Sequence, residues 1–450
     1  MNILLCSEFY APSVGGVQEV MRQLAERFVA RGHAVTVATT ALPQRTFTKL
    51  HGVTIREFAI SGNLVRGMTG DLDAYRRFVI EQAFDVVMIK AAQQWTFDAL
   101  WPVLDRISGG KVFIPCGFSS LYEPAYAGYF DELPAVLKQF DHLIFYASDY
   151  RDIRFAKQCG LTNMSIIPNG ASESEFGGSR DRSFRKRHGV GEEDLFFLSV
   201  GSPAKMKGHY ELAEAFLKAD FSGRPAVLML NAGASLAGLV PPSPPAMPAK
   251  VSAYWRAVNA VREQEGILSA IMHVGHGVLN KLGVRLGRYA GRAEALCEEP
   301  QNTFQAIREA IDRQANGKRV MLTDFPRPDL VQAYMNADLF VFASHVEYSP
   351  LVLFEAAAAG TPFLSVPVGN AREIAEWTGG GEICQAPQDE RGYVRVVPAV
   401  FAEQWSRLAR DRAHLQRMGQ AGNSAWSARF TWERIADQYE RIFQKVAIHA

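Results

Sequence analysis

Short apolar runs alternate with helical patterns along most of this chain. Between the runs, apolar residues recur at helical spacing, as in Val20, Leu24 and Phe28. The runs have the length of buried strands and lie at 2–6, 34–38, 85–90, 111–115, 142–148, 164–168, 195–201, 225–233 and 337–342. Repeated strand–helix units with right-handed connections build parallel sheets covered by helices. The pattern therefore predicts an α/β fold with doubly wound sheets.

At 450 residues the chain is too long for one ordinary core, and we predict two Rossmann-like domains facing a cleft. The expected divisions are a first domain at 1–172, a linker at 173–192, a second domain at 193–428 and a C-terminal helix at 429–450 that crosses back to the first domain. A proline tract opens an atypical helical insertion at about 234–317. His273 and His276 lie in it, and we interpret them as loop histidines because no Cys, Asp or Glu stands beside them at ligand spacing.

The composition excludes several classes of protein. With 48 basic and 47 acidic side chains there is no overall field to attract nucleic acid. Five scattered cysteines without a C-x-x-C favour a reducing compartment over a disulfide or zinc framework. Met1 leads directly into the first predicted strand, so we expect no signal peptide, and the longest apolar stretch, 226–240, is too short and interrupted to span a bilayer. We expect a cytoplasmic protein and leave open a peripheral contact with the inner face of the membrane.

The stretch VEYSPLVLFEAAAAGTPFLSVPVGNAREI at 346–374 carries the strongest functional signal. Glu347 and Glu355 are 355 − 347 = 8 positions apart. Glu347 follows a predicted strand, and Glu355 is expected about two turns inside a helix that Ser349 and Pro350 begin and Gly360 ends. The amides of a helix N-terminus suit a phosphate, and a carboxylate can accept hydrogen bonds from a diol. This arrangement suggests a sugar nucleotide bound at the carboxyl edge of a sheet.

The same stretch resembles the E-x7-E signature of the retaining, GT-B-fold glycosyltransferases of family four. Further segments resemble that family in the same order: the Gly15-Gly16 loop with RGHAVTVAT behind it, IPNGASESEF at 167–176, SPAKMKG at 202–208 and the terminal FTWERIADQYERIFQKV. The resemblance implies a GT-B enzyme that transfers a sugar from a nucleotide-sugar donor with retention, without a cofactor and without a required metal.

The resemblance also assigns roles to individual residues. Glu347 would hold the donor sugar and Glu355 the ribose, while Lys207 and Lys205 would neutralise the departing diphosphate. The remaining donor-side residues are Gly201, Ser202, Ser349, Pro350 and Leu351, and those of the acceptor and phosphate loops are Gly15, Gly16, Cys116 and Gly117.

The chain departs from the family pattern at three positions. Ser202 stands where an arginine is expected, Ser172 replaces an aspartate, and Cys116 replaces a histidine. Lys205 could supply the missing charge, although a lysine lacks the bidentate fork of arginine.

The segment after Cys116 is unusually aromatic, with Phe118, Tyr122, Tyr126, Tyr129 and Phe130. Such a run could stack on an acceptor sugar or touch a membrane surface. Packing in the core is the more common use of such residues, so the sequence favours packing here.

Two alternatives to a glycosyltransferase stay open: a GT-B enzyme of another class, such as a sugar-nucleotide epimerase, and a non-catalytic nucleotide-sugar-binding protein. A dehydrogenase is disfavoured because the G-x-G-x-x-G fingerprint is missing. The sequence does not identify the base and sugar of the donor. It also leaves open whether the acceptor is a saccharide, a lipid-linked saccharide or a small molecule.

Overall fold

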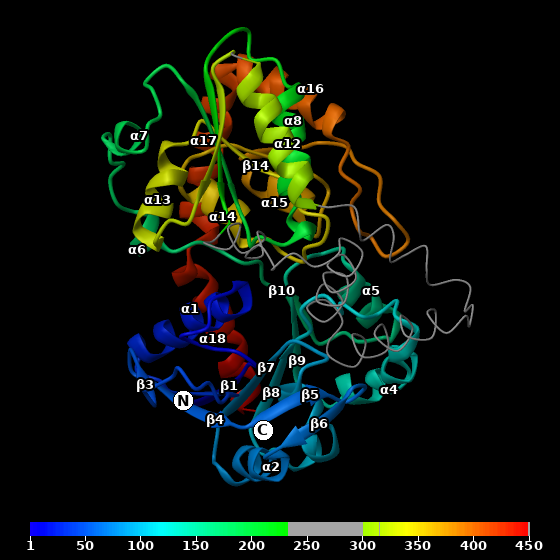
Figure 1. The fold of residues 1–450 in the computed structure, drawn as a ribbon. Coiled ribbons are helices and arrows are strands. Elements are labelled where there is room, and N and C mark those ends of the chain that lie inside the picture. Colours follow the sequence, from blue (N-terminus) through cyan, green and yellow to red (C-terminus); the bar gives the residue numbers. More distant parts are fainter. Residues whose placement is uncertain (233–299, 315, 449–450) are drawn as a thin grey trace, which may run out of the picture.

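The computed structural model describes residues 1–232, 300–314 and 316–448. These residues form two α/β domains joined by a linker and by a C-terminal helix that returns to the first domain (Figure 1). Most of the predicted insertion, including His273 and His276, lies outside the described residues.

A parallel sheet of eight strands forms the centre of the first domain. Its strand order is β10-β9-β8-β7-β1-β2-β4-β3, and only β3 runs antiparallel to its neighbour. A separate two-stranded hairpin pairs β5 with β6. The strands are β1 (Asn2–Cys6), β2 (Ala34–Thr40), β3 (Lys49–Leu50), β4 (Val53–Phe58), β5 (Ile60–Asn63), β6 (Gly67–Gly70), β7 (Val86–Lys90), β8 (Gly110–Ile114), β9 (His142–Phe145) and β10 (Met164–Ile166).

Helices pack on both faces of this sheet because its central strands are apolar on both sides. All five residues of β7 are buried, and α1 buries Val20, Leu24 and Phe28 as its helical spacing predicts. The helical elements are α1 (Gly16–Ala30), α2 (Leu72–Glu81), α3 (Trp95–Asp98), η1 (Trp101–Arg106), η2 (Pro124–Tyr126), α4 (Ala127–Leu137) and α5 (Arg151–Gln158).

The second domain is built on a wholly parallel sheet of six strands in the order β13-β12-β11-β14-β15-β16. Its strands are β11 (Leu195–Val200), β12 (Ala226–Asn231), β13 (Lys318–Thr323), β14 (Leu339–Phe342), β15 (Phe363–Ser365) and β16 (Gly381–Ile383). Its described helical elements are η3 (Lys205–Lys207), α8 (His209–Lys218), α12 (Pro300–Arg313), α13 (Arg327–Asn336), α14 (Leu351–Ala358), α15 (Ala371–Thr378), α16 (Pro398–Arg410) and α17 (Arg412–Ala425).

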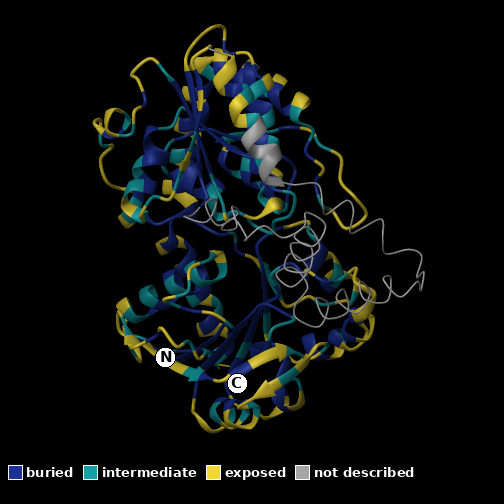
Figure 2. Cartoon of the chain, viewed as in Figure 1, coloured by how far each residue is buried: buried dark blue, intermediate teal, exposed yellow. Residues whose placement is uncertain are grey.

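The strand order of each sheet reverses once, between β1 and β7 in the first domain and between β11 and β14 in the second. Ligands of open α/β sheets bind at the carboxyl ends of the strands beside such a reversal. The strands are the most buried part of both domains, and the exposed residues gather on the outer helices and loops (Figure 2). The fold therefore points to the loops after β1, β7, β11 and β14 as the functional region.

The chain passes between the domains twice, and the two passages run side by side. The amide of Ala171 donates to the carbonyl of Phe430 (3.0 Å), and the indole of Trp426 donates to the carbonyl of Ala171 (3.0 Å). A short π-helix, η5 (Trp426–Phe430), leads into α18 (Trp432–Ile448). Figure 1 shows α18 descending beside α1 of the first domain.

The buried face of α18 joins the hydrophobic core beneath α1 in the first domain. Phe443 and Tyr439 are buried, and the ring of Phe443 lies 5.2 Å from that of Phe28. At the rim, Arg31 forms ion pairs with Asp437 and Glu440, both at 2.7 Å. The last helix of the chain therefore belongs to the packing of the first domain.

The segment predicted as a linker packs closely on the second domain. It contains α6 (Glu173–Phe176) and α7 (Phe184–Arg187), and Phe184 is fully buried in the second core. In the basic cluster at 185–188, the side chain of Arg185 is turned away from solvent. Its guanidinium donates to the carbonyl of Asn336 (2.9 Å) and to Asp338 (2.8 Å), because these acceptors come close only when α13 packs beside α7.

We predict that Phe443→Ala destabilises the first domain by about 3–5 kcal/mol, because it opens a cavity between α18 and α1. Chemical denaturation followed by circular dichroism measures the loss. The control is Gln444→Ala on the exposed side of the same helix, which should change stability by less than about 0.5 kcal/mol. Equal effects of the two substitutions would show that α18 is not packed as described.

Candidate functional site

Glu347 lies on the loop that follows β14, as its position after an apolar run predicts. Its carboxylate accepts a hydrogen bond from the ammonium of Lys207 (2.5 Å) and another from the hydroxyl of Ser344 (3.0 Å). The structure thus brings together two of the predicted catalytic residues, which are 140 positions apart in the sequence.

Gly208 makes this ion pair possible. Its φ is +70°, and a Cβ atom there would lie only 1.9 Å from the carbonyl oxygen of Ala343. Only glycine combines that backbone conformation with so close an approach. The loop carrying Lys207 therefore rests directly against the end of β14, where Glu347 begins its own loop.

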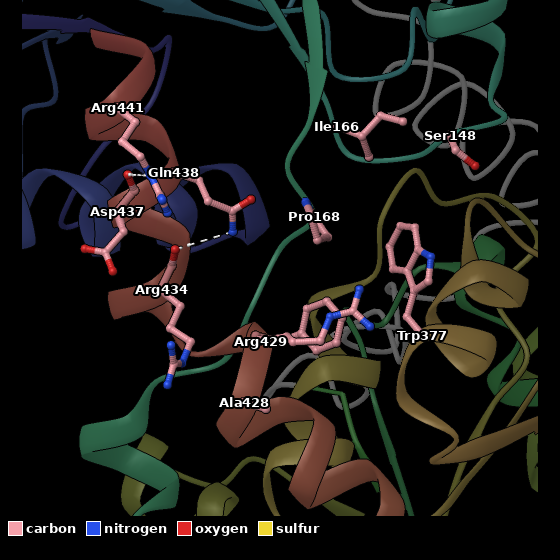
Figure 3. Close-up of a pocket in the computed structure, with 11 residues that line it drawn as sticks. Ser148, Ile166, Pro168, Trp377, Ala428, Arg429, Arg434, Asp437, Gln438 and Arg441 are labelled. Atoms are coloured by element: carbon pink, nitrogen blue, oxygen red, sulfur yellow. Dashed lines mark hydrogen bonds between the residues drawn. The ribbon is translucent and has the colours of Figure 1, made fainter. Parts of the chain in front are cut away.

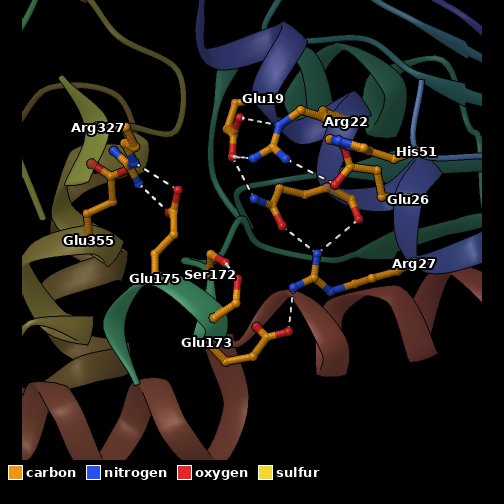
Figure 4. Close-up of polar contacts among 12 residues, drawn as sticks. Glu19, Arg22, Glu26, Arg27, His51, Ser172, Glu173, Glu175, Arg327 and Glu355 are labelled. Carbon is orange, nitrogen blue, oxygen red and sulfur yellow. Dashed lines mark hydrogen bonds and ion pairs between the residues drawn. The ribbon is translucent and has the colours of Figure 1, made fainter. Parts of the chain in front are cut away.

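Glu355 is buried in α14, with its side chain 10% exposed, and it is held by a residue that the motif did not predict. Arg327, at the start of α13, donates to Glu355 (2.6 Å) and to Glu175 of α6 (2.7 Å). Figure 4 shows the guanidinium between the two carboxylates. Burial opposes the charge of Arg327, but Glu355 and Glu175 outweigh that effect and raise its pKa. The arginine is therefore firmly charged.

The charge of Arg327 also reaches the first domain. Burial raises the pKa of Glu19 in α1, but hydrogen bonds from Arg22 and Gln23 and the positive charges of Arg22 and Arg327 outweigh it. The net result is a lowered pKa. Figure 4 shows this cluster on α1 facing the carboxylates around Arg327. The positive charge of Arg327 on the second domain thus favours the charged form of a carboxylate on the first.

The predicted start of the helix after Glu347 needs correction. The helix begins at Leu351, and Pro350 before it is extended, with ψ 113°. Ser349 does not cap it: the buried hydroxyl has no hydrogen-bond partner, and its carbonyl accepts from Asn169 (3.1 Å). Glu355 is therefore 355 − 351 = 4 positions from the first helical residue, just over one turn inside instead of two. The stop at Gly360 is confirmed, with φ +70°.

Ser202 leaves the diphosphate side of the site without its expected arginine. Ser202 is exposed, and its carbonyl is in hydrogen-bond contact with His209 (3.0 Å). Lys205 is also exposed, in the short η3 turn, and no ion pair to it is present in the described part of the chain. Gly201 immediately precedes Ser202. A Cβ atom placed on Gly201 would lie 3.5 Å from the side chain of Lys207. Lys207 therefore lies beside Gly201, at the start of the loop that also carries Lys205.

Tyr348, which the motif also did not mark, inserts from the second domain into the first. Its ring stacks on Tyr146 (5.4 Å) and packs against Tyr150 (4.9 Å). Its hydroxyl accepts from the amide of Tyr146 (3.0 Å) and is hydrogen-bonded to Asp152. Tyr150 in turn donates to the carbonyl of Glu347 (2.8 Å). The loop that holds Glu347 is thereby fastened to the first domain on both sides.

Asp152 shows the electrostatic consequence of this contact. Burial raises the pKa of Asp152 to about 6, although hydrogen bonds from Tyr348 and from the amides of Gly117 (2.8 Å) and Ile153 (2.9 Å) favour its charged form. The carboxylate is therefore sensitive to the loss of any of these donors.

Among the predicted residues of the first domain, Gly117 lies at this contact and Gly16 lies at the start of α14. Gly117 has φ +88°, and a Cβ there would be 3.1 Å from the ring of Tyr348. Cys116 precedes it, and burial raises the pKa of its thiol to about 11, so the group is a neutral thiol at pH 7. Gly16 faces the second domain, since a Cβ on it would lie 3.7 Å from Leu351 at the start of α14. Gly15 immediately precedes α1.

Four of the five aromatic residues after Cys116 serve packing. Phe118, Tyr126, Tyr129 and Phe130 are buried in the core of the first domain. Tyr129 also donates to Asp98 (2.8 Å), and Tyr126 accepts from Asn63 (3.0 Å). Tyr122 is 50% exposed and is the member of this group that a ligand could reach.

Two family models match the chain on either side of the insertion. The model described as Glycosyltransferase Family 4 matches residues 14–175, and the model described as Glycosyl transferases group 1 matches residues 292–411. The chain belongs to the group 1, family 4 glycosyltransferases. The first match contains Gly15, Gly16, Cys116 and Gly117, and the second contains Glu347 and Glu355.

Curated relatives match this chain over only part of their length. A glycogen synthase of Mycobacterium tuberculosis is 30% identical over 115 residues, which cover 26% of either chain. A D-inositol 3-phosphate glycosyltransferase of Corynebacterium diphtheriae is 32% identical over 158 residues, which cover 34% of either chain. The matched stretches thus span about a quarter to a third of these relatives.

Solved structures match over the whole chain and establish the GT-B fold. Sucrose-phosphate synthase from Thermosynechococcus elongatus aligns with a TM-score of 0.67 at 17% identity and covers 100% of both chains. The Anabaena protein HepE, solved in complex with UDP-glucose, aligns with a TM-score of 0.62 at 14% identity, covering 99% of this chain and 100% of HepE. At these identities the comparison concerns the fold alone.

We predict that Tyr348→Phe raises the pKa of Asp152 above its present value of about 6, because the charged carboxylate loses a hydrogen-bond donor. Titration of the carboxyl carbon by NMR measures this change. The loss of the hydroxyl from a buried network should also lower stability by about 1–3 kcal/mol. The control is Tyr122→Phe, which removes an exposed hydroxyl. If the pKa of Asp152 were equal in the two variants, the contact between Tyr348 and Asp152 would be contradicted.

Proposed function

We propose that this protein is a retaining glycosyltransferase that moves a sugar from a nucleotide-sugar donor to a hydroxyl acceptor. The observation that carries the proposal is the convergence of Lys207, Glu347 and Glu355 at the carboxyl edge of the second sheet, opposite Gly16 of the first domain. A cation for a diphosphate and two carboxylates for sugar hydroxyls are the groups that such a donor needs.

Glu355 is the proposed ligand of the donor ribose. Its carboxylate is buried, so hydrogen bonds from a diol would form away from competing water. Arg327 contacts one oxygen of this carboxylate. If the ribose displaces the guanidinium from Glu355, the guanidinium keeps Glu175 as a partner. That HepE, a protein of the same fold, was solved with UDP-glucose supports a nucleotide sugar as the donor.

Lys207 and Lys205 are the proposed partners of the leaving group. In the reaction the bond between the anomeric carbon and the diphosphate oxygen breaks, and a bond to the acceptor oxygen forms. The proton of the acceptor hydroxyl passes to the departing nucleoside diphosphate, whose charge the lysines stabilise. Retention follows if the departing phosphate and the incoming hydroxyl occupy the same face of the sugar. The proposal includes no cofactor and no required metal.

The acceptor is proposed to bind on the first domain near Gly15, Gly16 and the exposed ring of Tyr122. Its class, whether a saccharide, a lipid-linked saccharide or a small molecule, is left to experiment. None of the helices in the described ranges is long and apolar enough to cross a membrane. Action in the cytoplasm, with the acceptor free or at the inner membrane face, is part of the proposal.

We predict that one member of a panel of UDP-, GDP-, ADP- and dTDP-sugars raises the melting temperature of the wild type and not of Glu355→Ala. A ligand at 100 times its Kd stabilises the folded state by ~2.7 kcal/mol, which a thermal-shift assay detects readily. The matched control is Glu376→Ala, which removes an exposed glutamate of α15 and should keep the full shift. A shift that survives in Glu355→Ala would contradict the ribose assignment.

The same panel separates the proposed enzyme from a non-catalytic binding protein, the alternative that Ser202, Ser172 and Cys116 keep open. A nucleotide sugar that binds tightly but is not turned over with any acceptor tried would favour the binding protein. An altered sugar nucleotide released in the absence of an acceptor would favour an epimerase.

We predict that Lys207→Ala lowers kcat about 100- to 1000-fold, because one preorganised charge on the leaving group is lost. Initial rates with saturating donor measure the effect. Lys205→Ala should also lower kcat if this residue replaces the missing arginine, whereas Lys186→Ala on the exposed side of α7 should not. An unchanged kcat in Lys207→Ala would remove this lysine from the mechanism.

A further inference from the structure

A cavity lies at the junction of the two domains, apart from the proposed donor site. Its volume is about 700 Å³, within the range of small-molecule sites. The first domain contributes Ser148, Ile166 and Pro168, the second domain contributes Trp377, and the crossing at 428–441 supplies the rest of the wall (Figure 3). Glu347, Glu355 and Lys207 do not line it.

Three arginines on the crossing make the cavity basic. Arg434 and Arg441 are seven positions apart on α18, so they lie on one side of the helix, and Arg429 precedes the helix. All three are exposed, and their described contacts are to uncharged groups. Arg434 donates to the carbonyl of Ser427 (3.3 Å), Arg441 to the carbonyl of Asp437 (3.2 Å), and Arg429 lies over the ring of Phe430.

The acidic residue of the cavity wall does not neutralise these charges. The carboxylate of Asp437 is paired with Arg31 of α1 at 2.7 Å. Among the described residues, no ion pair joins a carboxylate to Arg429, Arg434 or Arg441. Three guanidinium groups therefore border one cavity with their charges uncompensated by protein, which favours an anionic ligand.

Apolar side chains line the cavity opposite the arginines of α18. Trp377 is half-buried and stacked on Phe430, with 21° between the rings, and Figure 3 shows its indole across the cavity from the arginines of α18. Ile166, which is 40% exposed, and Pro168 also line the cavity. A half-buried indole with apolar neighbours suits the C–H face of a sugar ring, which is apolar while its hydroxyls point outward.

We propose that this cavity binds a phosphorylated sugar, with the phosphate on the arginines and the ring against Trp377. Guanidinium forks match phosphate oxygens in geometry and charge, and they bind them more strongly than neutral donors do. Both domains and the crossing contribute to the wall, so a bound ligand stabilises the domain arrangement in which these three segments come together. The proposal rests on the cavity and is independent of the proposed transferase chemistry.

The test is isothermal titration calorimetry of the full chain with glucose 6-phosphate, glucose and inorganic phosphate. The wild type should bind glucose 6-phosphate more tightly than either part alone. The double variant Arg434→Gln/Arg441→Gln should bind it about ten- to a hundredfold more weakly, because two charged hydrogen-bond donors are removed. Both arginines are exposed, so the variant should keep the melting temperature of the wild type, which is checked first.

Two further variants locate the ligand. Trp377→Leu should bring the affinity for glucose 6-phosphate down to that for inorganic phosphate, because the contact with the ring is lost. Arg412→Gln removes an exposed arginine of α17 outside the cavity and should leave binding unchanged.

Three results would overturn the proposal. The first is no binding of glucose 6-phosphate by the wild type, and the second is an unchanged affinity in the double variant, which would place the ligand elsewhere, such as in the donor site. The third is binding to vesicles that contain phosphatidylinositol phosphate without binding of the free sugar phosphate, which would make the surface a lipid contact. Nucleotide-sugar binding, measured separately, decides the proposed function and is not affected by any of the three.

Discussion

The hydroxyl of Tyr348 joins the two domains at the point where the site is built. It sits between the amide of Tyr146 and the carboxylate of Asp152, and Gly117 leaves room for its ring. Because Glu347 is its neighbour in the chain, any movement of one domain relative to the other acts directly on Glu347. The geometry of the donor side is therefore coupled to the first domain by a buried polar contact, which costs free energy whenever it is broken without a replacement partner.

An ion-pair network around Arg327 joins the second domain to the interdomain segment beside Glu355. Arg327 holds Glu355 and Glu175 together, so a helix of the second domain and the segment that leads out of the first domain share one cation. In this state a buried carboxylate that would otherwise lack a counter-charge is compensated by protein. If the ribose of a donor donated hydrogen bonds to Glu355, Arg327 would still be paired with Glu175.

The two chain crossings help to hold the domains in the arrangement that forms these contacts. Ala171 and Phe430 are hydrogen-bonded to each other, and α18 is packed into the first domain by an aromatic face. The domains are thus connected by two adjacent crossings of the chain at one edge. The arginine-lined cavity lies at this edge and receives residues from both domains.

Local patterns in the sequence determined a large part of the fold. Runs such as 2–6 and 195–201 became buried strands because their apolar residues are contiguous, and Gly360 ended α14 because glycine adopts a positive φ without strain. The pair Glu347 and Glu355 was visible because both residues lie in one short strand–helix unit. Strand β4 was not predicted, because the prediction relied on contiguous apolar runs, whereas β4 alternates buried and exposed residues and pairs with β2 through the backbone.

Only the tertiary structure decided which groups meet across these units. Arg327 reaches Glu355, and Tyr348 reaches Tyr146 over 202 positions of sequence, because separate helices and sheets pack together. The same packing buried four of the aromatic residues after Cys116 and removed Arg185 from solvent. A local pattern records which face of a segment is apolar. The partner that this face will find depends on contacts between segments far apart in the sequence, and no spacing within one segment carries that information.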